Sequence, residues 1–209
     1  MEIDKKLIEY IDSNVFPSYE KNEWGHGIDH IKEVIRRSIK FADTVENIDY
    51  NMVYTIAAYH DIGHYINPKL HEKISADMLY ADKNLKNFFN DEQIRIMAEA
   101  VEDHRSSIDG EPRSIYGKIV SSADRPIVVE KAIKRTYTYT LEHNPEYSLD
   151  QIVERSRQHL IDKFCKNGYA REKMYFEDIE YIQFLKDMEK ITKDASKFKK
   201  EYIKIVGIK

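Results

Sequence analysis

The sequence predicts an all-α fold. Its 209 residues include only seven glycines and five prolines, so few residues interrupt a helix, and Lys, Glu, Ile, Tyr and Ala are abundant. Apolar residues recur about every three or four positions along most of the chain, which is the spacing of one helix face. No segment has a convincing strand pattern, and the chain contains no internal repeat or low-complexity tract.

Six helices are expected before residue 126. The positions come from apolar stripes and from the residues that start or stop helices, such as Pro17 after the first stripe and the Asn90–Gln93 pair, which suits an N-terminal capping box. In chain order we expect helices at residues 3–15, at 28–45, from 51 to the His60–Asp61 pair, from His71, from Asn90 to His104, and from 115 to 124.

The remaining chain is expected to add three helices and a solvated tail. Pro126 suits the first turn of a helix that runs to Glu142, and Ser148 with Gln151 suits a capping box for a helix that ends near residue 166. The last helix starts near Glu177, and the Lys-rich tail is interpreted as a solvated face. We expect a metal-binding helical core at residues 1–145 and a C-terminal helical extension at 146–209, packed on the same domain.

Composition excludes several classes of function. No run of about 18 uncharged apolar residues is present, and the charged N-terminus has no apolar signal region. We therefore expect no membrane span. The single cysteine, Cys165, cannot form an internal disulfide, which suits a reducing compartment, so we expect a cytoplasmic protein. The net charge of −4 gives no bulk basic field for nucleic acid. A small phosphorylated ligand needs only a local cluster of cations and remains open, as does a homodimer.

Residues typical of metal sites stand at the ends of the expected helices. His60 continues the apolar stripe of Val53, Ile56 and Ala57, so its imidazole should point into the core, and Asp61 follows it directly. A buried carboxylate is costly unless it is paired or binds a metal. The other members of the set, each beside core positions, are His30, His71, His104 and Asp124.

These six side chains are imidazoles and carboxylates, which suit Fe, Mn, Zn, Co or Ni. Six ligands exceed what one tetrahedral site needs. They would suit two metals if one carboxylate bridged them, and Asp61 is the natural bridge. We therefore predict a cofactor of one or two divalent transition metals.

The same segments resemble the HD superfamily of metal-dependent phosphohydrolases. The matching pieces are His30 with the apolar residues after it, the run from Ala58 to Gly63, His71 with Ser75, His104, and Asp124 between Ala123 and Arg125. The resemblance covers about residues 24–128 and implies an all-α helical bundle. It also implies that His30, His60, Asp61 and Asp124 hold the first metal, and that His71 and His104 hold a second.

The resemblance implies hydrolysis of a phosphoester or phosphoanhydride by metal-activated water, with a nucleotide or related small phosphoester as substrate. We assign catalytic roles to Asp61, His64 and Arg105. His64 stands where the family often has lysine, and for both His64 and His26 a structural role is an alternative. Cations that could bind phosphate are Arg105, Arg113, Lys118 and Arg125, with His26 as a further phosphate contact.

Two other classes stay open. A few proteins of this fold are di-iron oxygenases with the same set of six ligands, and only an assay without oxygen separates them from hydrolases. The third class is a signalling module that binds metal and ligand without turnover. Since none of the expected ligands is missing, the module without turnover is disfavoured. The preferred hypothesis is the hydrolase that the resemblance implies.

Overall fold

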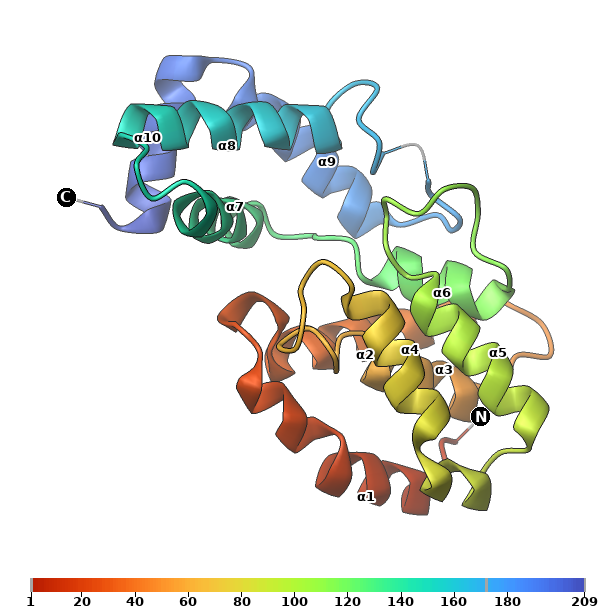
Figure 1. Cartoon of the computed structure of the whole chain (residues 1–209). Coiled ribbons are helices and arrows are strands. Elements are labelled where there is room, and N and C mark those ends of the chain that lie inside the picture. The colour runs from red at the N-terminus through yellow and green to blue at the C-terminus, as the bar shows by residue number, and fades with distance from the viewer. Residues whose placement is uncertain (1, 172, 209) are drawn as a thin grey trace. The chain divides into compact units, whose positions relative to one another are not determined.

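The computed structural model describes residues 2–171 and 173–208, and every regular element within them is a helix. The all-α prediction is therefore confirmed. The chain divides into two compact units, Met1–Asp124 and Arg125–Lys209, whose helices are labelled in Figure 1. Within the described residues, no helix is both long enough and apolar enough to cross a lipid bilayer.

The first unit is built around α3, which spans Tyr50–Tyr59. Every residue of α3 from Met52 to Tyr59 is buried, because this stretch has no charged side chain and other helices pack on several sides of it. The helices that contact α3 are α1 (Lys5–Asn14), α2 (Ile28–Ala42), α4 (His71–Ala81), α5 (Asp91–Glu102) and α6 (Ile115–Ala123). Short 3₁₀ helices occupy Phe16–Lys21 (η1), Trp24–His26 (η2) and Lys83–Asn87 (η3).

Local signals fixed most helix ends in this unit. The capping box predicted at Asn90 is present, since its side chain accepts from the Gln93 amide at 2.9 Å and Gln93 accepts from the Asn90 amide at 3.0 Å. The α4 helix opens at His71 as expected. The α2 helix ends three residues earlier than predicted, at Ala42, and α5 ends at Glu102, so that His104 lies in the turn that follows.

A partly buried carboxylate, that of Asp82, links α3 to α1. Asp82 accepts hydrogen bonds from the hydroxyls of Tyr10 at 2.5 Å and Tyr59 at 2.6 Å. Burial, together with these bonds to the carboxylate, raises the pKa of both phenols, so both remain donors at neutral pH. Tyr59 is the last residue of α3, so this network also fixes the point at which the chain leaves the helix for His60.

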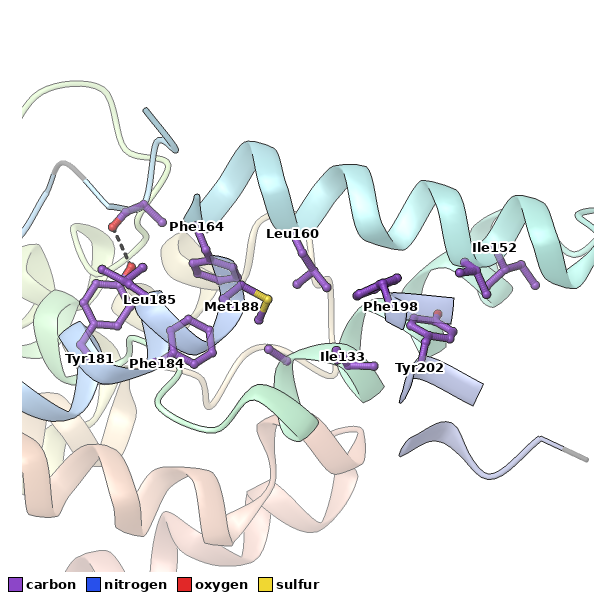
Figure 2. Close-up of a cluster of buried hydrophobic side chains, with 13 residues drawn as sticks. Ile133, Ile152, Leu160, Phe164, Tyr181, Phe184, Leu185, Met188, Phe198 and Tyr202 are labelled. Atoms are coloured by element: carbon purple, nitrogen blue, oxygen red, sulfur yellow. Dashed lines mark hydrogen bonds between the residues drawn. The ribbon is translucent and has the colours of Figure 1, made fainter. Parts of the chain in front are cut away.

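The second unit contains α7 (Val129–His143), α8 (Leu149–Phe164), α9 (Ile179–Thr192) and α10 (Ala195–Val206). Its core is drawn in Figure 2, where Tyr181 also donates to the carbonyl of Ala170 at 2.9 Å. The predicted capping box of Ser148 and Gln151 begins α8. The core side chains come from all four helices and include Ile133, Ile152, Leu160, Phe164, Phe184, Leu185, Met188, Phe198 and Tyr202.

Three features of this unit differ from the sequence expectation. The units divide after Asp124 rather than at residue 145, because α7 packs against α8 and α10 through Ala132 and Ile133. The Lys-rich tail is not simply a solvated face, because it forms α10, which buries Phe198 and Tyr202 one turn apart while Asp194 caps its N-terminus. The start of α7 also moves from Pro126 to Val129.

Candidate metal centre

The six predicted ligands meet at one place in the first unit. Each stands at a helix end or in the turn next to one, where a side chain can reach inward beyond the core stripe. His30 is in the first turn of α2, and His60 and Asp61 follow α3. His71 opens α4, His104 follows α5, and Asp124 follows α6.

Four of the side chains form a first group. The Nε2 atom of His30 lies 3.1 Å from Oδ1 of Asp124 and 3.6 Å from Oδ2 of Asp61. Nε2 of His60 lies 3.4 Å from both Nε2 of His30 and Oδ2 of Asp61, and 3.8 Å from Oδ1 of Asp124. Ligands about 2.1 Å from a shared metal lie roughly 3.0 to 3.5 Å from one another, so this spacing suits a single cation.

A second group shares Asp61 with the first. Its other oxygen, Oδ1, lies 3.3 Å from Nε2 of His71 and 3.6 Å from Nε2 of His104. The two imidazole nitrogens are 3.2 Å apart. Asp61 therefore presents one oxygen to each group, an arrangement that would let its carboxylate bridge two cations.

The tautomers of three imidazoles follow from their second nitrogen. In each ring Nδ1 lies at hydrogen-bond distance from the carbonyl three residues earlier, and a carbonyl can only accept, so Nδ1 carries a proton. Nε2 then keeps its lone pair for the centre of the cluster, as in metal-binding histidines. The pairs are His60 with Ala57 at 2.8 Å, His71 with Pro68 at 2.8 Å, and His104 with Val101 at 2.6 Å.

The donor set fits a metal ion. Asp61 Oδ1 is buried, and no hydrogen bond satisfies it. Its neighbours Nε2 of His71 and His104 are themselves acceptors in the tautomer just described. Acceptors gathered around a buried carboxylate are unfavourable unless a cation lies among them. Imidazole with carboxylate is the combination that divalent transition metals prefer.

The electrostatics of the first group also favour a positive charge at its centre. Burial alone would lower the pKa of His60, but the carboxylates of Asp61 and Asp124 outweigh it and raise that pKa to about 9. Burial would conversely raise the pKa of both carboxyls. The surrounding histidines, His60 and His30 foremost, instead hold the pKa of Asp61 and of Asp124 well below its usual range.

The turn that presents Asp61 depends on Gly63. The Gly63 amide donates to Oγ of Ser75 on α4 at 3.0 Å. A Cβ atom on Gly63 would lie 2.6 Å from Cγ2 of Ile74 and 3.0 Å from the Ser75 amide nitrogen. The turn can pack this closely on α4 only without a side chain at this position, and the contact brings Asp61 and His71 together.

His26 and His64 lie beside the cluster and stack on each other. Their ring centroids are 3.7 Å apart with an interplanar angle of 21°, and the His64 ring is 5.1 Å from that of His71. Burial, reinforced by the charge of His26, lowers the pKa of His64 to about 4, so His64 is neutral. Nδ1 of His26 pairs with Oε1 of Glu23 at 2.9 Å. Glu23, His26 and His64 form a third group with metal-ligand spacing.

Arg105 is within reach of the cluster but already has partners. Its Nη1 donates to the carbonyl of Lys69 at 3.0 Å and to Oε2 of Glu72 at 3.1 Å. Glu72 directly follows His71, so Arg105 ties the turn after α5 to the start of α4. About a third of the Arg105 side chain remains exposed.

The other three cations that were predicted to bind phosphate also have partners within the protein. The guanidinium of Arg113 makes several hydrogen bonds to the buried carboxylate of Asp103 and one to Glu102, so a phosphate would compete with two carboxylates. Lys118 pairs with Glu111 at 2.7 Å. Arg125 begins the second unit, where it is buried and donates to the carbonyl of Lys173 at 3.2 Å. A role in substrate binding remains a prediction for all three.

Three residues near the cluster had no role in the sequence analysis. Asn22 donates to the carbonyls of His26 at 2.9 Å and Asp61 at 3.0 Å, which joins the segment around η2 to the turn after α3. Glu23 orients His26. Its position three residues before His26 was the only feature of the sequence that could have indicated this contact. The buried Arg37 donates to the carbonyl of Ala123 at 2.5 Å, which fixes the end of α6 just before Asp124.

Comparison with protein families agrees with this geometry. Residues 27–126 match the model of the HD domain family. The chain contains an HD domain. The matched span begins just before His30 and ends just after Asp124, so it contains the whole cluster, and the resemblance to the HD superfamily is confirmed. No curated protein and no solved structure matches the chain. HD domains bind divalent metals, and most members of the superfamily are metal-dependent phosphohydrolases.

Proposed function

We propose that this HD-domain protein hydrolyses a small phosphoester or phosphoanhydride, with a nucleotide as the preferred class of substrate. The observation that supports the proposal is the position of the Asp61 carboxylate. Its two oxygens face two separate sets of histidines. Two divalent metals bound there would lower the pKa of water and polarise a phosphoryl group.

The position of each residue in the cluster suggests its role. His30, His60, Asp61 and Asp124 would hold one metal, while Asp61, His71 and His104 would hold the other. Because Asp61 faces both groups, its carboxylate would also help to orient the attacking water between them. The protonated Nδ1 atoms keep three of the imidazole rings fixed, which preorganises the site.

Groups beside the metals would bind the phosphate. His64 is neutral and buried, and it stacks on His26, so it can donate or accept one hydrogen bond without bringing a charge. His26 is held by Glu23 and is more exposed. Arg105 would supply positive charge from the turn after α5, and it would exchange its ion pair with Glu72 for the phosphate.

A substrate panel tests the function. Purified protein loaded with Mn²⁺, Fe²⁺, Co²⁺, Ni²⁺ or Zn²⁺ would be assayed for phosphate release from nucleoside mono- and triphosphates and from generic phosphoesters. We expect hydrolysis that depends on metal and is strongest for a nucleotide. No phosphate release from any substrate with any of the five metals would contradict the proposal.

A second candidate function is a di-iron oxygenase, which the same bridging arrangement favours. The two candidates differ in their need for oxygen. Phosphate release measured in air and under argon on one Fe²⁺-loaded sample should be equal for a hydrolase. An activity that consumes oxygen and stops under argon would establish the oxygenase instead.

Metal content is the first quantitative prediction. The two groups of donors should give one to two equivalents of transition metal for each chain, measured by elemental analysis after dialysis. Acidification should release the metal, because protons compete for the histidine Nε2 atoms. Protein that contains no metal and gains none on incubation would show that the cluster is a network of hydrogen-bonded histidines.

Arg105→Ala provides the second prediction. The guanidinium cannot ligate a metal, so the substitution should raise KM about ten-fold or more while the metal content stays the same. Arg105 also bonds to Lys69 and Glu72 beside His71, so a structural role would show itself as a loss of metal. If the metal content falls in parallel with activity, Arg105 acts by holding the start of α4 and His71.

A further inference from the structure

Asn22 is a partly buried side chain that makes three hydrogen bonds, all to backbone groups beside the metal cluster. Its Nδ2 donates to the carbonyls of His26 at 2.9 Å and Asp61 at 3.0 Å, and its Oδ1 accepts from the amide of Tyr65 at 2.9 Å. The reversed orientation of this amide would place its oxygen against two carbonyls and its nitrogen against an N–H group. The three partners therefore fix the orientation of the side chain.

One of these bonds leads by a short path to His30. The carbonyl of His26 directly precedes Gly27, which is the residue before α2. The carbonyl of Gly27 accepts from the amide of His30 at 3.0 Å, in the first turn of the helix. Asn22 therefore fixes the backbone from which α2 begins, and that first turn presents the imidazole of His30.

The other two bonds lead to the turn that carries Asp61. The Asp61 carbonyl accepts from the amide of His64 at 3.0 Å as well as from Asn22, and Tyr65 directly follows His64. Asn22 thus donates at one end of this turn and accepts at the other. Because the backbone around a ligand decides where its side chain points, a shift at Asn22 would move the carboxylate of Asp61.

The starting point of the Asn22 side chain is itself fixed on α3. The amide of Asn22 donates to the carbonyl of Tyr19 at 3.2 Å. The hydroxyl of the buried Tyr19 donates to the carbonyl of Ala58 at 2.7 Å, in the last turn of α3, where carbonyls have no partner within the helix. Asn22 therefore extends from a point held on the core of the unit, which allows it to act as a spacer.

The distance that this spacer controls is the one between His30 and Asp61. Nε2 of His30 lies 3.6 Å from Oδ2 of Asp61, within the first group of ligands. The second group meets at the other oxygen of Asp61, and a different contact joins its two segments, the hydrogen bond from the Gly63 amide to Ser75 on α4. Loss of the Asn22 contacts should therefore disturb the first group more than the second.

We propose that Asn22 is a positioning residue of the metal centre. It sets the spacing of His30 and Asp61, and thereby the affinity of the first group for a divalent metal. The proposal rests on the proposed function for the assignment of these side chains as ligands, and it is independent of the reaction catalysed. Asparagine suits this position because it offers two donors and an acceptor on a short side chain, whereas serine has a single donor and an ionised aspartate has none.

Metal affinity of Asn22→Asp tests the proposal directly. The full-length protein would be titrated with Co²⁺ in competition with a fluorescent chelator. Aspartate keeps the acceptor and loses both donors, so the dissociation constant of the first group should rise about ten-fold. The added negative charge alone would strengthen cation binding, so weaker binding identifies the lost donors as the cause.

Asn14→Asp is the matched control, because Asn14 donates to the carbonyl of Tyr10 at 2.9 Å on an exposed part of α1. It makes the same chemical change away from the cluster and should leave the affinity unchanged. Dissociation constants for Asn22→Asp and Asn22→Ala equal to that of wild type would overturn the proposal.

A double-mutant comparison separates positioning from a general loss of stability. His71→Ala leaves the first group intact, and in this background Asn22→Ala should weaken binding about ten-fold. His30→Ala leaves the second group intact, and there the same substitution should have an effect of about two-fold or less. Equal loss of affinity in both backgrounds, together with a lower melting temperature of the metal-free protein, would show that Asn22 only stabilises the fold, and would overturn the proposal.

Hydrogen exchange of the wild-type protein needs no variant to fold. The Tyr65 amide should exchange slowly because Asn22 accepts its proton, and Zn²⁺ should slow it further, because a metal that fixes Asp61 also fixes this turn. Fast exchange, or exchange that Zn²⁺ does not change, would overturn the proposal. Metal affinity that depends on Asn22 without phosphate release supports the positioning role and removes the hydrolase. Phosphate release by wild type with unchanged affinity in the Asn22 variants keeps the hydrolase and removes the positioning role.

Discussion

Asp61→Asn should reduce turnover about a thousand-fold or more, which corresponds to about 4 kcal/mol of activation free energy. Asparagine keeps the size of the side chain but removes the charge that faces both groups of histidines. The amide nitrogen would also replace one of the two oxygens, so a hydrogen-bond donor would stand where the carboxylate offers a lone pair to a metal. The metal content should therefore fall together with the rate.

The fold should survive this substitution, because the helices are held by apolar contacts around α3 and not by the cluster. Circular dichroism and phosphate release from the best substrate would be measured on one sample. Asp77→Asn makes the same chemical change on the exposed face of α4 and is the matched control. A folded Asp61→Asn protein with near wild-type rate and metal content would show that Asp61 is only a helix-end residue.

Gly63→Ala should destabilise the first unit by about 2 kcal/mol and also reduce the metal content. The added Cβ would lie 2.6 Å from Cγ2 and 2.9 Å from Cβ of Ile74, so the turn and α4 must move apart. That movement also weakens the hydrogen bond from the Gly63 amide to Ser75. For a chain of this size the melting temperature should fall by roughly 4 to 8 °C.

Thermal unfolding by circular dichroism, with elemental analysis of the same preparation, measures both effects. Gly27→Ala is the control, because a Cβ there would lie no closer than 3.8 Å to its nearest neighbour. It should change stability by less than about 1 kcal/mol. If Gly63→Ala melts like Gly27→Ala and keeps its metal, the close approach of the turn to α4 is not what positions Asp61.

The sequence was sufficient to predict the features that depend on local chemistry. Helix class follows from apolar spacing and the scarcity of breakers, and the capping boxes at Asn90 and Ser148 follow from side chains three residues apart. Candidate ligands could be chosen because several imidazoles and carboxylates stand beside core positions near the ends of separate expected helices. The match to the HD domain family spans all six of these candidates.

Features that depend on contacts between distant segments could not be read from the sequence. The pairing of Arg113 with Asp103 is one example, because nothing in the local pattern distinguishes an arginine that faces a phosphate from one that faces a carboxylate. The Lys-rich tail is another, since Phe198 and Tyr202 become core residues only once α7 and α8 provide a surface to cover. The same contacts place α7 in the second unit.

The sequence by itself determined an all-α chain whose helix ends carry six side chains with metal-binding chemistry, because residue type and helical spacing are local properties. Only the tertiary structure decided that these side chains converge, and that Asp61 turns one oxygen to His30 and His60 and the other to His71 and His104. The direction of a lone pair depends on how separate helices pack. In this unit that packing is set by the buried surface of α3 and the close contact of Gly63 with α4.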